Sequence, residues 1–358
     1  MKNRRYLIWF SVICLALIIG YLPLMPAYAQ PKVTKLIFTT AHPETSHDVV
    51  KFERPFLDSI EKATQGRIVI ERYHSESLLK ERDFLSGLKT GTCDIAWMPF
   101  HLWIGLTPIF EFLTLPFVGF TGGSQQASGI MWRLYEKFPE IRKELDAIGQ
   151  PLSFYSVGPY HLITTKKQVK TLGELKGLKI RSGGGPPADA MKALGAVPVV
   201  VSMPETYLAM QKGVIDGMGI SYAGLSMFRQ WEVAKYFTVV PMYSMNTSIM
   251  VSKDKWKSLP PDIQEQIMSV SGLKASMRYG YVVDAVKDLV FDEAKKGGKE
   301  VIEYVLPPGE FATWQAACKP VWDAWIEKMV GSGYSRARLQ EIIDTTKELI
   351  NAYKPLYQ

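Results

Sequence analysis

Cysteine is scarce in this 358-residue chain, which contains only three. Cys14 lies in an apolar leader segment, so Cys93 and Cys318 are the two that remain beyond it. Two cysteines so far apart form neither a disulfide framework nor a zinc-binding spacing. The sequence leaves open whether these two form a single bridge.

Spacings that carry common enzyme chemistry are also missing. The five histidines include no His-Glu-x-x-His pair, and no Cys-x-x-Cys occurs. The run 219–224 resembles a Gly-x-Ser-x-Gly nucleophile elbow, but its second glycine comes one place too late. The glycines 183–185 form neither a Walker loop nor a dinucleotide-binding fingerprint. We therefore predict no enzyme activity, no cofactor and no metal.

No run of basic residues occurs, although the formal net charge at pH 7 is +7. Lys2, Arg4 and Arg5 precede an apolar stretch over 6–24 and the small-x-small site 27–29. This order is typical of a secretory signal peptide. We predict a signal peptide over 1–29, cleavage after Ala29, a periplasmic location and no nucleic-acid partner. An uncleaved membrane anchor is the alternative.

Strand and helix patterns alternate along the rest of the chain. Pro55 falls inside the first predicted helix and should kink it. The alternation indicates an α/β fold, with sheets flanked by helices. Predicted strands are 36–40, 67–72, 94–98 and 300–306, and predicted helices are 47–65, 80–89, 261–296, 310–330 and 335–353.

One helix–turn–strand unit occurs twice in the sequence. In each copy, apolar residues three apart share a helix face, a glycine ends the helix and an aspartate begins a strand. Two such units predict two similar lobes, and a cleft between lobes is a common place for a small ligand. The two sets are Leu85, Leu88, Gly91 and Asp94, then Tyr207, Met210, Gly213 and Asp216.

Two apolar segments, 155–163 and 242–251, are predicted to connect the lobes. Neither is rich in glycine or serine, and both have the pattern of strands. A hinge made of strands allows two lobes to close without drifting apart. The chain beyond Ala29 is also longer than a usual single core, which favours two lobes.

Arg181 stands where a predicted strand passes into a predicted helix. Leu178 and Ile180 give the strand its apolar side, the glycines 183–185 form a turn, and prolines 186–187 suit the first helical turn. Free backbone N–H groups at a helix start favour an anion. A guanidinium beside them can bind a carboxylate through two hydrogen bonds. The alternative is a structural arginine in a surface ion pair.

Trp97 lies near the end of the predicted strand 94–98, and Phe100 follows this strand closely. Ligands of α/β proteins collect at the carboxyl ends of strands, so these aromatic residues are candidates for a pocket wall as well as for the core. His42 follows the first strand in the same way. It either reaches the cleft or lies in a surface turn with Pro43.

Three motifs occur in a specific order: 171–181, 193–198 and 205–217. With them, the chain from about Lys35 to Met329 resembles the solute-binding proteins of tripartite ATP-independent periplasmic (TRAP) transporters, of the C4-dicarboxylate-binding (DctP) type. Thr171 with Glu174 is also a helix capping box, which gives part of the first motif a structural reason.

The resemblance implies an α/β, two-lobe periplasmic-binding-protein fold (type II-like) with a strand hinge and a long lobe-bridging C-terminal helix. Lobe I would comprise 30–158 and 247–285, and lobe II 159–246 and 286–358. The resemblance also implies that Arg181 binds the carboxylate of the ligand bidentately.

The chain departs from some members of this family. The second arginine of the sialic acid-binding members falls at His161, which can donate to an anion or be satisfied by the backbone. The asparagine of other members falls at Ile220 or Ser221, so Asn246 on the second connecting strand is a candidate substitute.

Met203 takes the place of an aromatic residue that contacts the ligand in the sialic acid-binding members. An acidic position of other members falls near Met98–Phe100, which is apolar here. Tyr222 and Tyr160 are candidates for hydrogen bonds to the ligand at the rim of its site. These departures favour an acid with an apolar or aromatic body over a hydroxylated sugar acid.

We predict a monomeric periplasmic receptor that captures an organic acid anion, a mono- or dicarboxylate. The receptor would deliver the anion to the membrane subunits of a TRAP permease for ion-gradient-driven uptake. The alternatives are a binding protein of an ATP-driven (ABC) transporter or sensor, and a periplasmic enzyme acting on a carboxylic acid.

Overall fold

The computed structural model describes residues 33–120, 122–201 and 203–357. The predicted signal peptide, residues 1–29, lies outside them. One structural unit, Thr34–Gln358, contains all of the helices and strands below. Across the described ranges, no helix is both long and apolar enough to cross a membrane.

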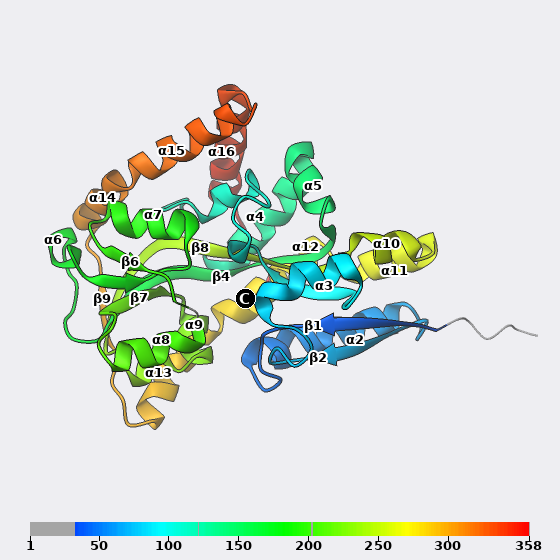
Figure 1. Ribbon diagram of the computed structural model, residues 1–358, viewed down its shortest axis with the longest axis horizontal. Coiled ribbons are helices and arrows are strands. Elements are labelled where there is room, and N and C mark those ends of the chain that lie inside the picture. The colour runs from blue at the N-terminus through cyan, green and yellow to red at the C-terminus, as the bar shows by residue number, and fades with distance from the viewer. Residues whose placement is uncertain (1–32, 121, 202, 358) are drawn as a thin grey trace, which may run out of the picture. The chain divides into compact units, whose positions relative to one another are not determined.

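The first lobe is built on three parallel strands, in which β1 lies between β2 and β3. Leu36 and Phe38 alternate along β1 and are fully buried, because successive side chains of a strand point to opposite faces. Phe56 and Ile60 of the covering helix pack into the same core. The elements are β1 (Thr34–Thr39), α2 (Arg54–Ala63), β2 (Ile68–Tyr73), α3 (Phe84–Thr90) and β3 (Ile95–Pro99) (Figure 1).

The second lobe repeats this succession with shorter strands. Here β5 lies between β6 and β7, again in parallel. The elements are β5 (Lys179–Arg181), α7 (Gly185–Ala193), β6 (Val197–Val199), α8 (Met203–Gln211) and β7 (Gly217–Ile220). The prediction of two similar lobes is therefore confirmed.

The two aspartates of the repeated unit have the same structural role. The carboxylate of Asp94 accepts the backbone N–H of Ile37 on β1 at 2.9 Å, and that of Asp216 accepts the N–H of Lys179 on β5 at 2.9 Å. In both cases the aspartate's own N–H donates back to the same strand residue. The aspartate thus satisfies both the N–H and the C=O of one strand residue. This explains why each copy of the repeated unit has an aspartate at this position.

Two long antiparallel strands connect the lobes: β4 (Gly149–Thr164) and β8 (Tyr236–Ser252). The strand order is β2-β1-β3-β8-β4-β7-β5-β6, and β9 (Ile302–Val305) pairs with β8. The pairing of β4 with β8 shifts register at three points, where a strand bends most readily. The predicted strand hinge is confirmed.

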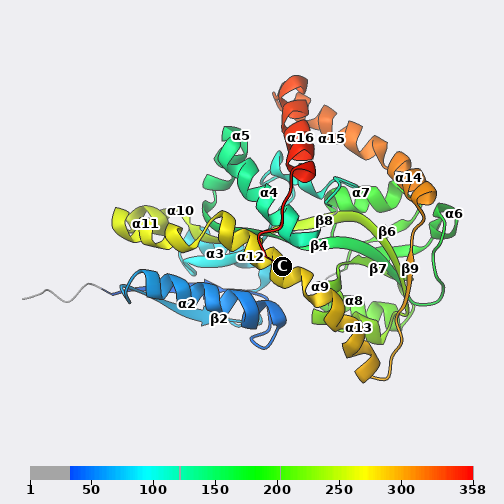
Figure 2. The same cartoon turned by 180° about the vertical axis from the view of Figure 1, so that it is seen from behind.

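A pair of successive helices spans both lobes. α12 (Leu273–Asp284) packs against α4 (Gly123–Lys137) and β4, and α13 (Val286–Lys296) packs against α9 (Tyr222–Met227) of the second lobe. Figure 2 shows the two, in yellow and gold, crossing in front of the sheet when the molecule is seen from behind. The predicted bridging helix is therefore α12–α13, which precedes the last three helices rather than ending the chain.

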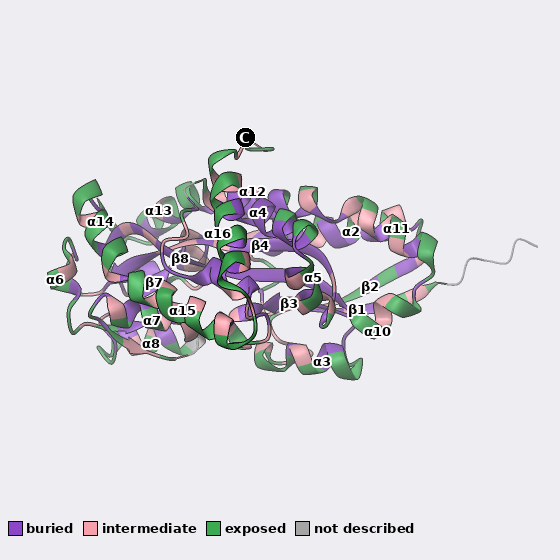
Figure 3. Ribbon diagram, turned by 90° about the horizontal axis from the view of Figure 1, so that it is seen from above, coloured by how far each residue is buried: buried purple, intermediate pink, exposed green. Residues whose placement is uncertain are grey.

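The C-terminal helices α15 (Lys319–Gly331) and α16 (Arg336–Asn351) add Trp325 and Ile342 to the core of the first lobe. The lobe boundaries given above stay a prediction. Figure 3 shows the central strands buried and α14 mostly exposed. The remaining helices are α5 (Pro139–Asp146), α6 (Leu172–Leu175), α10 (Lys253–Ser258), α11 (Pro261–Val270) and α14 (Pro308–Ala317).

The sequence predicts a kink at Pro55 and leaves open whether the two cysteines pair. The chain over Val49–Glu53 forms a turn of π-helix before α2 begins, because Pro55 has no N–H to donate to a regular α-helical ladder. Cys93 and Cys318 are both buried and unpaired, in separate hydrophobic clusters.

Candidate functional site

Arg181 ends β5 with its side chain only 6% exposed. Its Nε donates to the backbone oxygen of Val201 at 3.1 Å. Among the described residues no carboxylate lies within ion-pair distance of its guanidinium. A buried arginine without a counter-charge is costly unless an anion joins it. Arg181 is therefore not the structural arginine in a surface ion pair that the sequence left open as an alternative.

Among the described residues, four titratable groups lie within the field of Arg181, two from the first lobe and two from the connecting strands. They are Glu81, His101, Tyr160 and Tyr243. Burial raises the pKa of Glu81 to about 7, against the opposing charges of His42 and Arg181. Burial and the charge of Arg181 together lower the pKa of His101 to about 4. The guanidinium thus lies at the junction of the lobes.

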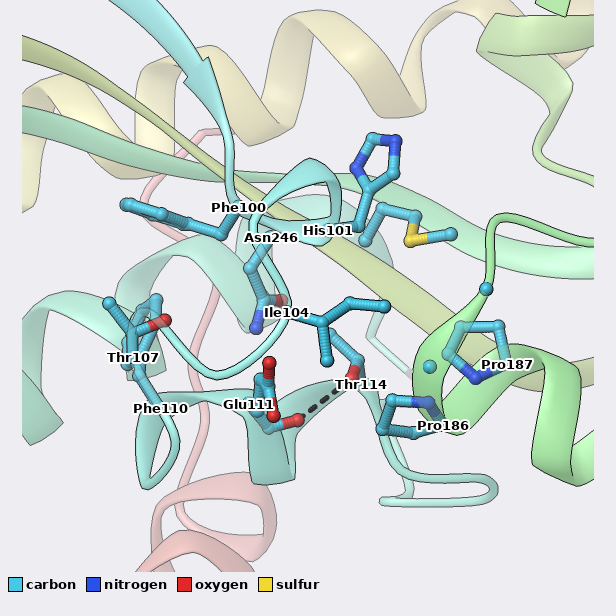
Figure 4. Close-up of a pocket in the computed structure, with 13 residues that line it drawn as sticks. Phe100, His101, Ile104, Thr107, Phe110, Glu111, Thr114, Pro186, Pro187 and Asn246 are labelled. Atoms are coloured by element: carbon cyan, nitrogen blue, oxygen red, sulfur yellow. Dashed lines mark hydrogen bonds between the residues drawn. The ribbon is translucent and has the colours of Figure 1, made fainter. Parts of the chain in front are cut away.

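A narrow cavity lies between the lobes near the start of α7 (Figure 4). Its volume of about 20 Å³ is room for one water molecule. Asn246 of β8 lines it, is 1% exposed, and neither atom of its amide has a hydrogen-bond partner among the described residues. The other lining residues are Phe100, His101, Ile104, Thr107, Phe110, Glu111, Thr114, Gly184, Gly185, Pro186, Pro187 and Met245.

The glycine turn after Arg181 allows the lobes to touch. Gly184 and Gly185 have φ of +83° and +56°, a region that side chains disfavour. A Cβ at either position would lie 3.5–3.6 Å from Ile104, which belongs to the first lobe. A Cβ at Gly183 would lie 2.8 Å from Cε of Met245. Because the cavity beside this turn has room for only one water molecule, an organic acid requires the lobes to separate there.

His42 and Trp97 lie together in the first lobe, with ring centroids 4.3 Å apart. His42 is 5% exposed, so it is not in the surface turn that was the alternative. Burial alone would lower the pKa of His42, but Glu53, whose carboxylate lies 2.6 Å from Nδ1, raises it above its usual value. Trp97 Nε1 donates to the hydroxyl of Tyr155 at 2.7 Å. These contacts fix both rings where β1 and β3 end.

His161 is buried on β4, and its Nδ1 accepts the backbone N–H of Val240 at 3.1 Å. Its ring packs near Tyr222 and Phe237, at 5.2 and 5.5 Å between centroids. Burial lowers its pKa to about 4, and Lys287 acts in the same direction. His161 is thus a neutral ring held by the backbone, and it supplies no second positive charge at neutral pH.

This neutrality predicts a pH effect on stability. The unfolded chain protonates His161 near pH 6.5 and the folded chain near 4, so acidification across that window favours unfolding. We expect His161→Asn, which keeps an acceptor for Val240, to reduce the loss of unfolding free energy between pH 7 and 4.5 by about 2 kcal/mol. Urea unfolding of both proteins at the two pH values measures this, and equal losses would contradict it.

The remaining predicted contacts have other partners. The hydroxyl of Tyr222 donates to Glu303 at 2.7 Å, and its ring stacks on Phe237. Met203 begins α8 and packs against a hydrophobic cluster of the second lobe that includes Met218 and Phe237. The structure thus brings Phe100 and Asn246 together at one cavity and pairs His42 with Trp97. Whether these side chains touch a ligand stays a prediction.

Glu81, His101 and Tyr243 were not among the site residues expected from the sequence. None belongs to a motif, and their shared signal is burial beside Arg181, which the sequence does not display. Within the described residues, no group of three His, Cys, Asp or Glu side chains is placed to hold a metal ion.

Residues 38–328 match the family model of the bacterial extracellular solute-binding proteins, family 7. The chain is 25% identical to the C4-dicarboxylate-binding periplasmic protein DctP of Rhodobacter capsulatus, over 85% of this chain and 90% of that one. It covers only 39% of another curated relative, a longer protein.

Two solved structures are similar to this fold at 25% identity. One is a TRAP solute-binding protein from Rhodoferax ferrireducens in complex with copurified benzoate, with a TM-score of 0.78 over 89% of this chain and 98% of that one. The other, from Bordetella bronchiseptica with bound mandelate, has a TM-score of 0.77 over 88% and 99%.

Proposed function

The chain belongs to family 7 of the bacterial extracellular solute-binding proteins, and from that premise we propose that it is the receptor of a TRAP transporter which captures an organic acid anion on Arg181. The observation that carries this proposal is the guanidinium itself, buried where the lobes meet and without a carboxylate partner among the described residues. A ligand carboxylate satisfies its free N–H groups through two parallel hydrogen bonds.

The ligand we propose is an acid with an aromatic or apolar body. Phe100, Ile104, Phe110 and Met245 make the walls of the cavity beside the start of α7 mostly apolar. Position 161 supplies no second cation, so one carboxylate is the anion that this side of the cleft neutralises. The benzoate and mandelate of the two similar structures are acids of this class.

The other predicted ligand contacts fall into two groups, which differ in whether the side chain already has a structural partner. Phe100 and Asn246 line the cavity, and His42 with Trp97 lies where β1 and β3 end, so we propose all four as parts of the ligand site. Met203, Tyr222 and His161 have structural partners of their own, and a ligand would meet only their remaining surface.

We propose that the receptor acts in the periplasm as a monomer after cleavage at Ala29. It would hand its ligand unchanged to the membrane subunits of the permease. Incubation with the bound acid should therefore yield no product, and a protein purified from the periplasm should begin at Gln30.

A binding screen tests the proposal. Benzoate, mandelate, succinate and glucuronate are added to the purified protein, and the melting temperature is followed with concentration. We expect benzoate and mandelate to raise it, because a ligand that binds only the folded state stabilises that state by mass action. Benzamide, which lacks the anionic oxygens, is the matched control. Equal shifts with benzamide, or none with any acid, would contradict a carboxylate receptor.

A further inference from the structure

Two hydroxyl groups beside Arg181 are buried and have no hydrogen-bond partner among the described residues: the Oγ of Ser182 and the phenol oxygen of Tyr243. Ser182 is 0% exposed and Tyr243 is 4% exposed. A buried hydroxyl without a partner loses its hydrogen bonds to water and gains nothing in return. Such groups are rare in folded proteins, and each requires a reason.

The two hydroxyls come from strands that are not neighbours, because β4 and β7 lie between β8 and β5. Tyr243 of β8 pairs with Tyr160 of β4, and their rings stack with centroids 5.3 Å apart. The Tyr243 hydroxyl reaches β7 at Gly219, where any Cβ would overlap it. Arg181, which Ser182 directly follows, pairs with Met218 of β7, the residue before Gly219. Both hydroxyls therefore lie at the step where β5 passes into α7.

This step already carries the other parts of an anion site. Ser182 directly follows Arg181, whose charge reaches Tyr243, and α7 begins at Gly185. Pro186 and Pro187 have no N–H, so the first turn of this nine-residue helix offers an anion only the free N–H of Gly185, besides that of its N-cap Gly184. Burial raises the pKa of Tyr243, so its phenol stays protonated and can donate.

We propose that the Ser182 and Tyr243 hydroxyls donate to the carboxylate held by Arg181 and so determine the specificity of this site for a monocarboxylate. They supply the hydrogen bonds that position 161 does not, and they add no charge. One guanidinium with two neutral donors balances a single carboxylate. Gly219 is then required because only glycine leaves room for the phenol oxygen. The inference rests on the proposed receptor function and adds donors to it.

The test is the pair of variants Tyr243→Phe and Ser182→Ala, titrated calorimetrically with benzoate and with mandelate. We expect each variant to bind the acid about 10- to 100-fold more weakly, the usual effect of losing one hydrogen bond to a charged group. Tyr73→Phe is the matched control, because the Tyr73 hydroxyl donates to exposed Glu71. Its affinity should equal that of the unmodified protein.

The melting temperature without ligand separates a binding role from a structural one. Removing a hydroxyl that has no partner leaves the ligand-free protein as stable as before, or more so. A lower melting temperature together with unchanged affinity would show that the hydroxyls serve the fold, and the inference would be overturned. Acid binding that Arg181→Ala abolishes but Tyr243→Phe leaves intact would overturn this inference alone. Absence of binding to the unmodified protein would overturn both it and the proposed function.

Discussion

Replacing Arg181 with alanine should abolish acid binding while the fold persists. Removing one partner of a buried, hydrogen-bonded charge pair costs on the order of 2–5 kcal/mol. That corresponds to a loss of affinity of roughly 30-fold to several thousand-fold. Isothermal titration with the acid that binds best measures the change. Arg181→Lys keeps the charge but loses the two-pronged geometry, so it should fall between the alanine variant and the unmodified protein.

Stability without ligand is the decisive second readout for Arg181. The guanidinium is buried, and among the described residues its only hydrogen-bond partner is the Val201 carbonyl, so its removal should leave the melting temperature unchanged or raised. Arg54→Ala is the control, since Arg54 is exposed and pairs with exposed Glu44. Undiminished affinity in Arg181→Ala would remove the basis of the proposed function.

Replacing Gly280 with alanine should destabilise the fold markedly. Gly280 lies on α12 where this helix crosses α4, and a Cβ there would overlap the backbone oxygen of Ser124. Backbone cannot give way as a side chain can, so the helices must move apart. We expect a loss of about 1–3 kcal/mol in the free energy of unfolding, the usual cost of overpacking. Urea denaturation measures it.

The same contact links the bridging helix to the lobes. Asp284 at the end of α12 accepts the N–H groups of Ser124 and Gln125 at the start of α4, at 2.7 and 2.9 Å. A shift of α12 strains these bonds, so Gly280→Ala should also weaken closure over a ligand. Gly309→Ala is the control, because a Cβ there meets nothing within 4 Å and the helix gains in stability. Equal stability of the two variants would contradict this account of the α12–α4 contact.

The repeated unit shows how far local pattern reaches. Gly91 and Gly213 end their helices with φ of +75° and +70°, as a glycine after an apolar helix predicts. Asp94 and Asp216 then lie before β3 and β7 as expected. Their hydrogen bonds to Ile37 and Lys179, however, cross 57 and 37 residues of sequence. The local pattern predicts the element, and only the sheet order reveals the partner.

His161 illustrates the opposite case. A histidine near the end of a connecting strand is compatible both with an anion contact and with a backbone contact, and the sequence does not separate them. The bulge in the pairing of β4 with β8 brings the N–H of Val240 to Nδ1, and the surrounding aromatic rings lower the pKa by burial. Both causes arise from segments distant in the chain.

The sequence by itself determined the α/β class, the duplicated lobe, the strand hinge and the position of Arg181 between strand and helix, because periodicity, glycine turns and helix starts are local properties of the chain. The tertiary structure decided what surrounds the guanidinium. Glu81, His101 and Tyr243 converge on it from three separate segments. The packing of distant segments decides which polar atoms are buried without a hydrogen-bond partner. A local sequence pattern does not specify that packing.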